Sequence, residues 1–464
     1  MGIFITVLFF LSIIFPILHL YHCLPWFRDP REKPKRNPTL KKWMAEHGHE
    51  TEDGISILIP SYNETGILET SIMNMKALPY SDLEVVYIND GSTDGSMDYL
   101  KKALQLKPCS RKMEGKLPYE RITGLFESEL RPNFYVINKL NGGKADALNA
   151  GIDFSSKELV VTLDADTILA DRALSAVNDT FKDENVIAAG GMVHVLQARS
   201  ADSRKRLSFR FANMLIRVQV LDFLKAFYIS KLSLVRFRAL AVISGAFGIF
   251  RKQALLDAGG YRKSIGEDID ITLRIHRLIE KQKNLKIVFI SDAVGYTELP
   301  ETLKDLTKQR LRWQKAYIDC FIHFRSFFAR TLFTKPVSFF YIFESFFVGT
   351  LAAYIMTGLV VVNILDDPQN TYLNYLFFYM FWAFMLGLLY DLVAIRQGKR
   401  YGFTFSKKDT YRVFTAILFD IFIFRFVTMY FVMYGSIAYF FNRKWNKVSR
   451  TGRNYHQQRS TPAA

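Results

Sequence analysis

The sequence predicts an α/β domain with a mostly parallel central sheet, fused to a helical transmembrane region. From about Gly54 to Pro300, short β-branched runs alternate with polar, helix-like stretches, as in sheets whose parallel strands are joined by helices. Residues 1–21 contain no Lys, Arg, Asp or Glu, and residues 337–441 hold long aromatic and aliphatic runs. These apolar runs exclude a simple soluble protein.

The first element is a predicted membrane-spanning helix over residues 1–21. Its apolar stretch is about twice as long as the core of a typical signal peptide, and no small-residue cleavage site follows it. The predicted juxtamembrane linker, residues 22–53, is basic through Arg28, Arg31, Lys33, Lys35, Arg36, Lys41 and Lys42. Because basic residues favour the cytoplasmic side of a membrane, we expect a cytoplasmic central domain and an external amino terminus.

Three more apolar segments, about 337–365, 372–395 and 411–441, predict transmembrane helices within residues 336–441. The link between the first two is short and acidic, as in an external turn, and the next link is basic, as in a cytoplasmic loop. The basic tail, residues 442–464, disagrees with this topology, because four spans leave it outside. Either the last segment re-enters through a break near Asp420 and Arg425, or the tail departs from the charge rule.

The net charge of +17 and the cysteine pattern limit the partners. The positive charge clusters beside the apolar spans, and no nucleic-acid-binding motif is present. Anionic lipid headgroups and a phosphorylated substrate therefore explain the charge better than nucleic acid. Cys23, Cys109 and Cys320 are an odd number without C-x-x-C spacing, which supports neither a disulfide framework nor a zinc site. We expect the central domain to face a reducing compartment.

The central domain, residues 54–300, contains four predicted strands, at 55–59, 83–88, 134–137 and 159–163. Ligands of such sheets bind at the carboxyl ends of the strands, so the residues after each strand are the candidates. The first strand leads to Tyr62, Asn63 and Glu64, and the second to Asp90. These side chains offer hydrogen-bonding groups for a base and a ribose. A purely local role is the alternative, because Ser, Asn, Asp and Gly are ordinary turn and cap residues.

The third and fourth strands lead to charged residues. Gly142 and Gly143 precede Lys144 at a predicted helix start, where backbone N–H groups and the ammonium are placed to hold a diphosphate. A solvated lysine after a glycine turn is the alternative. Asp164 and Asp166 directly follow the apolar fourth strand, and carboxylates at this spacing present oxygens to a hard divalent cation. Charges at the end of a buried strand need a partner, which favours the cation.

The segment Gly266-Glu267-Asp268 precedes a predicted helix over residues 269–279. Asp268 is either the N-cap of this helix or a general base that takes a proton from an acceptor hydroxyl.

Residues 302–330 predict one long amphipathic helix, which forms the interface segment 301–335 with Gln309, Arg312 and Trp313. The spacing places Gln309 on one helix face with both other residues. Trp313 is suited to stack on a sugar and Arg312 to neutralise a leaving diphosphate, whereas an aromatic and cationic membrane belt is the alternative.

Taken together in this order, the loops resemble the membrane-embedded processive family 2 glycosyltransferases, which include cellulose, hyaluronan, chitin and poly-N-acetylglucosamine synthases. The resemblance spans roughly residues 1–450 and rests on PSYNE, NDGSTD, GGKADALN, the D-x-D pair, the (T/G)ED motif and Q-x-x-R-W. It implies a GT-A fold for the cytosolic domain, a UDP-sugar donor, Mg²⁺ or Mn²⁺ and inversion at the anomeric carbon. It also implies extrusion of the growing chain through the transmembrane region.

The resemblance assigns the candidate site residues to three roles. The catalytic candidates are Asp268, Glu267, Arg312, Trp313 and Gln309, the donor-binding candidates are Tyr62, Asn63, Glu64, Asp90, Lys144, Asp164 and Asp166, and the metal ligands are Asp164 and Asp166.

Four ionisable residues, Glu344, Asp391, Asp420 and Arg425, lie inside apolar segments. An ionised group there is costly unless it faces a polar path or a partner. We expect at least two of them to line a polysaccharide path, with internal ion pairing or a position near the interface as the alternative.

The sugar stays open. The single amino-terminal span and the run SGAFGIFRK resemble poly-N-acetylglucosamine synthases, whereas Gly266-Glu267-Asp268 and the residues after Trp313 resemble hyaluronan and chitin-oligosaccharide synthases. The expected activity is polymerisation of UDP-glucose or UDP-N-acetylglucosamine into a β-linked extracellular polysaccharide by a multi-pass plasma-membrane protein. The expected partners are the growing chain and membrane lipids, with an accessory subunit or a homo-oligomer left open. Single transfer of a sugar to a lipid carrier and a non-catalytic sugar-nucleotide-binding scaffold are the alternatives.

Overall fold

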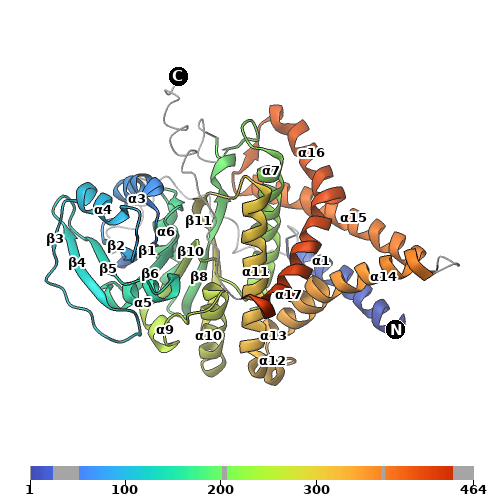
Figure 1. Ribbon diagram of the computed structural model, residues 1–464, viewed down its shortest axis with the longest axis horizontal. Helices are drawn as coiled ribbons and strands as arrows, with labels where there is room; N and C mark the ends of the chain where they lie inside the picture. The colour runs from blue at the N-terminus through green and yellow to red at the C-terminus, as the bar shows by residue number, and fades with distance from the viewer. Residues whose placement is uncertain (1, 24–51, 201–205, 367–370, 443–464) are drawn as a thin grey trace. The chain divides into compact units, whose positions relative to one another are not determined.

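The computed structural model describes residues 2–23, 52–200, 206–366 and 371–442 (Figure 1). The predicted linker, except for its ends, and the predicted tail after residue 442 lie outside these residues, as do residues 367–370 of the predicted external turn. The described chain divides into two compact units. The α/β unit contains residues 52–196 and 242–298, and the helical unit contains the rest.

A ten-stranded sheet forms the centre of the α/β unit, in the order β3-β4-β5-β2-β1-β6-β10-β8-β11-β7. Its strands are β1 (Ile55–Ser61), β2 (Leu83–Asp90), β3 (Leu106–Pro108), β4 (Ile122–Ser128), β5 (Phe134–Lys139), β6 (Leu159–Leu163), β7 (Ile168–Leu169), β8 (Val186–Val195), β10 (Phe247–Arg251) and β11 (Lys286–Thr297). Strands β2 and β6 are buried along their whole length, as their continuous apolar runs require when both faces of a parallel sheet are covered.

The core of the sheet is parallel, as predicted, and its outer parts are mixed. Strand β1 pairs in parallel with β2 and with β6, and β2 pairs in parallel with β5. Strand β10 runs antiparallel to both β6 and β8, and β4 runs antiparallel to β5. The sequence pattern predicts the four central strands but not β8, whose Ala-Ala-Gly-Gly segment has low strand propensity.

Helices α3 (Thr65–Ala77), α4 (Ser96–Leu104), α5 (Lys144–Phe154), α6 (Ala173–Phe181), α9 (Lys252–Asp257) and α10 (Glu267–Lys281) complete the α/β unit. Helix α5 packs closely on β1 and β2, because Gly151 has no side chain; a β-carbon there would lie 3.1 Å from Leu58 and Ile88. The parallel strands end at one edge of the sheet, and the strand order reverses at β1. This edge is where ligands of open α/β sheets bind.

The helical unit contains every apolar segment predicted to cross a membrane. Its helices are α1 (Gly2–Cys23), α7 (Met214–Lys225), α8 (Leu232–Arg236), α11 (Leu303–His323), α12 (Arg325–Thr331), α13 (Pro336–Phe339), α14 (Ala352–Asp366), α15 (Thr371–Arg400), α16 (Thr410–Phe419) and α17 (Arg425–Phe441). Three π-helical stretches join some of them in the described chain, at Ala226–Lys231, Phe340–Leu351 and Asp420–Phe424. Two short strands, β9 (Arg206–Leu207) and β12 (Thr404–Phe405), pair in parallel.

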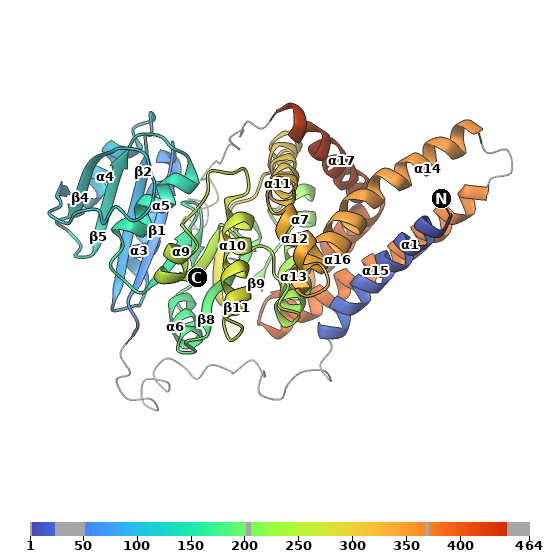
Figure 2. The same ribbon diagram turned by 90° about the horizontal axis from the view of Figure 1, so that it is seen from below.

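Four helical stretches of the described residues are long and apolar enough to cross a membrane, namely Ile3–His22, Pro336–Val362, Met380–Arg400 and Lys407–Phe441. Each overlaps one of the four predicted spans, with ends that differ by up to eight residues for Met380–Arg400 against the predicted 372–395. Helix α1 packs along α15 although the two are far apart in sequence (Figure 2).

The prediction of one long helix over residues 302–330 is wrong, because the chain forms α11 and α12 with a break at Phe324. Phe324 is fully buried and contacts the ring of Phe328, which stacks on Tyr341. The break thus lies at a residue buried by rings from later in the chain, which the local helical pattern does not reveal.

The last apolar segment is helical from Thr410 to Phe441. Near Asp420, where a break is one of the two predicted alternatives, the structure has the π-helical stretch Asp420–Phe424 within a continuous run of helix. The side of the membrane on which the basic tail lies stays open, because residues 443–464 are outside the described residues.

Each of the four ionisable residues in the apolar segments has a protein partner. Glu344 Oε1 lies 2.6 Å from His19 Nε2, and Arg425 donates to the carbonyl oxygen of Ala383. Lys225 Nζ lies 2.6 Å from Asp420 Oδ2 and 3.2 Å from Asp391 Oδ1. Internal pairing is thus the arrangement found, and the polysaccharide path stays a prediction.

Candidate active site

The loops after β1 and β2 are joined by hydrogen bonds. Asn63 N donates to Ser92 Oγ at 3.0 Å, and Thr93 N donates to Asn63 Oδ1 at 2.7 Å. Asn63 has a φ of +54°, a left-handed conformation that asparagine adopts more readily than most residues. Glu64 N donates to Ser96 Oγ at 3.0 Å. Asn63 therefore shapes the loop. The side chain of the preceding residue, Tyr62, is exposed.

Asp94 completes the junction between these loops. Its carboxylate accepts from the backbone N–H of Thr65 at 3.2 Å and of Ser96 at 3.0 Å. Burial works in the opposite direction, but the hydrogen bonds from Ser96 and Thr65 lower the pKa of Asp94. The sequence pattern contains this residue in NDGSTD without marking it as a support for the first loop.

Asp90 shapes the loop that carries Lys144. Its buried carboxylate accepts from Lys139 Nζ at 2.6 Å, Gly142 N at 3.0 Å and Gly143 N at 2.8 Å. Gly143 has a φ of +92°, which a residue with a side chain rarely adopts. Asp90 is the last residue of β2 rather than a loop residue. The local role is thus present, and the donor-binding role of Asp90 stays a prediction.

Lys144, at the start of α5, contacts acidic residues at the end of β6 and at the start of α10 (Figure 1 labels these three elements). Its ammonium lies 2.7 Å from Asp164 Oδ1, after β6, and 3.1 Å from Glu267 Oε1, the first residue of α10. A β-carbon at Gly245 would lie 2.8 Å from Lys144 Nζ and 3.7 Å from Asp268 Cβ, so the missing side chain leaves room for this approach.

The charge of Lys144 is stabilised by its neighbours. Burial alone disfavours the ammonium, but Asp164, Glu267 and Asp268 raise the pKa of Lys144 above its ordinary value. Lys144 is therefore charged at neutral pH, and the structure brings together four of the residues predicted from the sequence. We call Lys144, Asp164, Glu267 and Asp268 the Lys144 cluster.

Asp164 and Asp166 fit a hard divalent cation. Asp166 is buried, and its Oδ2 accepts from Thr297 Oγ1 at 3.3 Å, while the side chain of Asp164 is partly exposed. Mg²⁺ is often held by one or two carboxylates together with substrate phosphates, and Mn²⁺ accepts the same oxygen ligands. Within the described residues, no three or more His, Cys, Asp or Glu side chains gather into a metal site.

Asp268 is not the N-cap of its helix, contrary to one of the two predicted alternatives. The helix begins at Glu267, and Gly266 occupies the cap position without a side chain to donate or accept. Asp268 lies in the first turn, and its Oδ1 accepts from Ile269 N at 2.9 Å. A carboxylate in a first turn is stabilised by the helix dipole. The position leaves the general-base role of Asp268 as a prediction.

Tyr261 is a neighbour of the Lys144 cluster that the sequence pattern does not single out. Its buried phenol hydrogen-bonds to Thr162, and burial first, then the charges of Glu267 and Asp268, raise its pKa above the ordinary value. Asn149 holds its backbone, accepting from Tyr261 N at 2.7 Å and donating to Tyr261 O at 2.9 Å. A tyrosine after a Gly-Gly pair carries no signal that would reveal this position.

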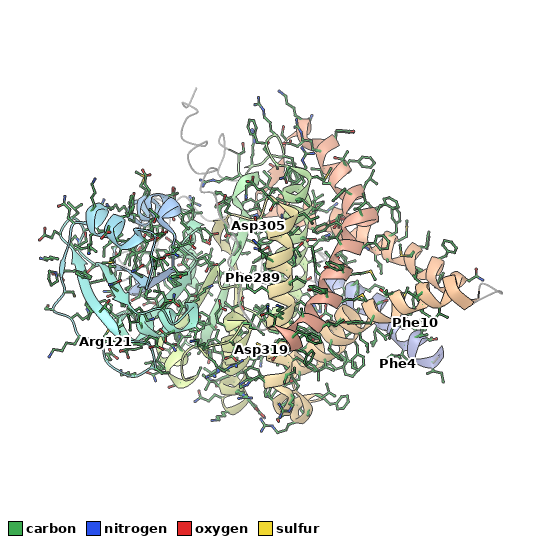
Figure 3. All side chains as sticks on the ribbon, in the orientation of Figure 1. Phe4, Phe10, Arg121, Phe289, Asp305 and Asp319 are labelled. Atoms are coloured by element: carbon green, nitrogen blue, oxygen red, sulfur yellow. The ribbon has the colours of Figure 1, made fainter. Side chains whose placement is uncertain are left out.

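Gln309, Arg312 and Trp313 lie on α11 of the helical unit, between Asp305 and Asp319 of the same helix, which Figure 3 labels. Gln309 is buried, and its Oε1 has no hydrogen-bond partner among the described residues. Trp313 is 38% exposed. The approach of these side chains to the Lys144 cluster stays a prediction.

Comparisons with known proteins point to one family. Residues 53–316, more than half of the chain, match the family model described as "Glycosyltransferase like family 2". The poly-beta-1,6-N-acetyl-D-glucosamine synthase of Staphylococcus epidermidis is 27% identical over 378 residues, which cover 79% of this chain and 80% of that protein. The enzyme of the same name from Staphylococcus aureus strain MSSA476 is 28% identical over 305 residues, 66% of this chain and 63% of that protein.

Among solved structures, the mannosyltransferase PcManGT from Pyrobaculum calidifontis in complex with GDP-Man and Mn²⁺ covers 94% of this chain and 100% of its own, with a TM-score of 0.48 and 15% identity. The family match spans β1 to β11 and therefore includes the Lys144 cluster. The predicted GT-A-like α/β fold with apolar helices is confirmed, and the chain belongs to glycosyltransferase family 2.

Proposed function

We propose that this chain is a processive, inverting glycosyltransferase. It polymerises UDP-glucose or UDP-N-acetylglucosamine into a β-linked extracellular polysaccharide and extrudes the product through its own transmembrane helices. The observation that carries the proposal is the Lys144 cluster beside the carboxyl ends of the parallel strands, in a chain whose described residues include four helical stretches apolar enough to cross a membrane. The similarity to poly-beta-1,6-N-acetyl-D-glucosamine synthases favours UDP-N-acetylglucosamine as the donor.

Different residues at the sheet edge bind different parts of the donor. Tyr62, Asn63, Glu64 and Asp90 border the position of the nucleoside, and Lys144 binds the diphosphate. Asp164 and Asp166 would hold a divalent cation, which neutralises the diphosphate charge when it is bound. Glu267 keeps Lys144 in place through their 3.1 Å ion pair.

Asp268 removes the proton from the acceptor hydroxyl as the acceptor oxygen attacks the anomeric carbon. The bond from that carbon to the diphosphate breaks, UDP leaves with the electron pair, and the configuration inverts. Arg312 neutralises the departing UDP, Trp313 stacks on the terminal sugar of the acceptor, and Gln309 supports their shared helix face.

Product analysis tests the proposed function. The purified full chain in lipid nanodiscs is incubated with radiolabelled UDP-N-acetylglucosamine or UDP-glucose, and the product is sized and digested with linkage-specific hydrolases. We expect a long β-linked polymer from one of the donors. A product that never exceeds one sugar on a lipid would instead identify single transfer.

The metal role is tested separately. EDTA should abolish transfer, and added Mg²⁺ or Mn²⁺ should restore it. Asp166→Asn should remove activity while the protein stays folded, and Asp98→Asn, which changes an exposed carboxylate on α4, is the matched control. Full activity in EDTA would contradict the assignment of Asp164 and Asp166.

The acceptor role is tested with Trp313→Ala and Arg312→Ala. Both variants should be folded and inserted in the membrane but unable to make long polymer. Polymer of unchanged length from Trp313→Ala would contradict the stacking role and would favour the membrane-belt alternative.

A further inference from the structure

We propose that Arg310 is a positioning residue that fixes the indole ring of Trp313, and that Asp222 of α7 anchors it. This inference rests on the proposed function, in which Trp313 stacks on the acceptor sugar. Arg310 directly follows Gln309 and occupies the first of the two positions that the motif Q-x-x-R-W leaves unspecified.

The guanidinium of Arg310 contacts Trp313 and Asp222 at the same time. Its central carbon lies 4.7 Å from the centroid of the Trp313 ring, within the range of a cation–π interaction. Its Nη2 donates to Asp222 Oδ2 at 3.2 Å. Its Nε is buried without a hydrogen-bond partner among the described residues. The carboxylate of Asp222 thus holds the guanidinium through Nη2.

Asp222 is itself held by a network of charges. It lies 3.5 Å from Lys225 one turn later on α7, and Lys225 contacts Asp391 of α15 and Asp420 of the π-helical stretch. Asp391 and Asp420 are buried. Buried, mutually paired charges resist displacement, because breaking one pair leaves its partner uncompensated. Arg310 is therefore connected to several helices rather than to α11 alone.

This arrangement restricts Trp313 without covering it. The ring stays 38% exposed, while the guanidinium occupies a position over one side of it. A sugar that stacks on the free side meets a ring already held in one orientation, and the entropy of ordering the indole is not lost again after each transfer. A processive enzyme gains from this because it must hold the new chain end after every cycle.

Four variants of the full chain test the inference. Arg310→Met removes the charge and keeps an unbranched, flexible side chain, Arg310→Lys keeps a cation, and Asp222→Asn removes the anchoring charge. Lys308→Met is the matched control, because Lys308 is a cation of the same helix that pairs with Asp305 one turn earlier.

Two measurements are made on each variant in nanodiscs. Replacing Trp26, Trp43, Trp382 and Trp445 by Phe leaves Trp313 as the sole tryptophan, and its fluorescence anisotropy reports how tightly the ring is held. Product length is measured with radiolabelled UDP-N-acetylglucosamine and UDP-glucose. Arg310→Met and Asp222→Asn should lower the anisotropy and shorten the product about tenfold, since a partly desolvated cation–π contact carries roughly that factor. Arg310→Lys should recover part of both losses, and Lys308→Met should match the parent.

The outcomes separate the inference from the proposed function. If Trp313→Ala shortens the product but Arg310→Met changes neither anisotropy nor length, the positioning role is wrong and the proposed function stands. If Arg310→Met mobilises the ring without shortening the product, holding the ring has no role in polymer synthesis and the inference is overturned. If Trp313→Ala itself leaves the product unchanged, the stacking role fails and the inference fails with it.

Discussion

Lys144 is the residue on which the candidate active site depends. Asp164 and Glu267 contact its ammonium directly, and Asp268 acts on it electrostatically. Without this cation the three carboxylates would repel one another, and the start of α10 would lose a connection to the end of β6. The cluster is therefore held together by contacts within the chain, in which the ammonium of Lys144 is balanced by the neighbouring carboxylates.

The variant Asp268→Asn tests whether Asp268 is the general base. Asparagine keeps the size of the side chain and still accepts from Ile269 N, but it cannot take a proton at neutral pH. We expect kcat to fall roughly 10² to 10⁴-fold with little change in UDP affinity, measured by isothermal titration. Asp98→Asn in the first turn of α4 should have no effect on either quantity. Parallel loss of UDP affinity would show that Asp268 is structural.

His194 gives a pH-dependent prediction. It is buried on β8, and burial lowers its pKa from 6.5 to about 3. Between these values the unfolded chain binds a proton that the folded chain does not. The stabilising effect of the neutral ring is therefore complete above pH 6.5 and is lost as the pH falls, by up to about 1.4 kcal/mol per pH unit.

The experiment compares the parent with His194→Gln. Lowering the pH from 7 to 5 should reduce the thermal unfolding temperature of the parent more than that of the variant. Taking the difference between the two proteins cancels the contribution of all other titrating groups. Equal reductions would mean that His194 is protonated in the folded state.

At the scale of elements, the contact between α11 and α17 is the closest tie between the Q-x-x-R-W helix and an apolar span (Figure 1). Gln314 Nε2 donates to Ser436 Oγ at 2.9 Å, and Tyr439 OH donates to Asp319 Oδ1 at 3.0 Å. Gly435 allows this approach, because a β-carbon there would lie 2.8 Å from Gln314 Cβ. The position of Trp313 thus depends on the packing of the last span.

Gly435→Ala should separate the two helices. Overpacking of this kind costs about 1–3 kcal/mol, so we expect a lower thermal unfolding temperature together with shorter polymer. Gly358→Ala on α14 is the matched control, because no atom lies within 4 Å of the added carbon, and alanine favours a helix over glycine. If Gly435→Ala keeps the same unfolding temperature and polymer length as Gly358→Ala, the close approach of α11 and α17 is not required for stability or polymer synthesis.

Two of the π-helical stretches contain ionisable residues of the apolar segments. Glu344 lies within one of them, and Asp420 begins another. A π-helix widens the helix and turns side chains toward directions that an α-helix does not offer, and such stretches often occur at functional sites. Here they coincide with the contact between His19 and Glu344 and with the ion pair Lys225–Asp420, which join helices that are distant in sequence.

At the scale of the whole molecule, the charge pattern predicts that the α/β unit is cytoplasmic. Cys109, which follows β3 in this unit, is partly exposed, whereas Cys320 is buried. In a Cys23→Ser, Cys320→Ala background, a membrane-impermeant maleimide should label Cys109 in inverted vesicles and not in intact cells. Cells permeabilised with detergent provide the control for accessibility. Labelling from the outside of intact cells would reverse the predicted topology.

Local patterns were sufficient for the central strands and the spans. Strand β6 has the predicted bounds, and β1, β2 and β5 begin at the predicted residues, because buried parallel strands leave continuous apolar runs that can be read in a short window. The four spans follow in the same way from length and hydropathy. The loop residues after the strands are candidates for the same kind of reason, because the carboxyl ends of parallel strands meet at one edge, and their roles stay predictions.

Tertiary structure decided what depends on partners distant in sequence. Asn149 holds Tyr261 across 112 residues, and His19 meets Glu344 across 325. Distant partners also explain three further features. Asp90 accepts from Gly143 N, helix α11 ends before the buried Phe324, and Arg310, which contacts Trp313, is held by Asp222. A local pattern records the period of burial along one element, but the energy of a buried polar group or ring is set by the atoms that surround it after folding. Local sequence patterns are therefore enough for the central strands, the apolar spans and the edge where the candidate site lies, whereas packing decides which side chains hold that candidate site in shape.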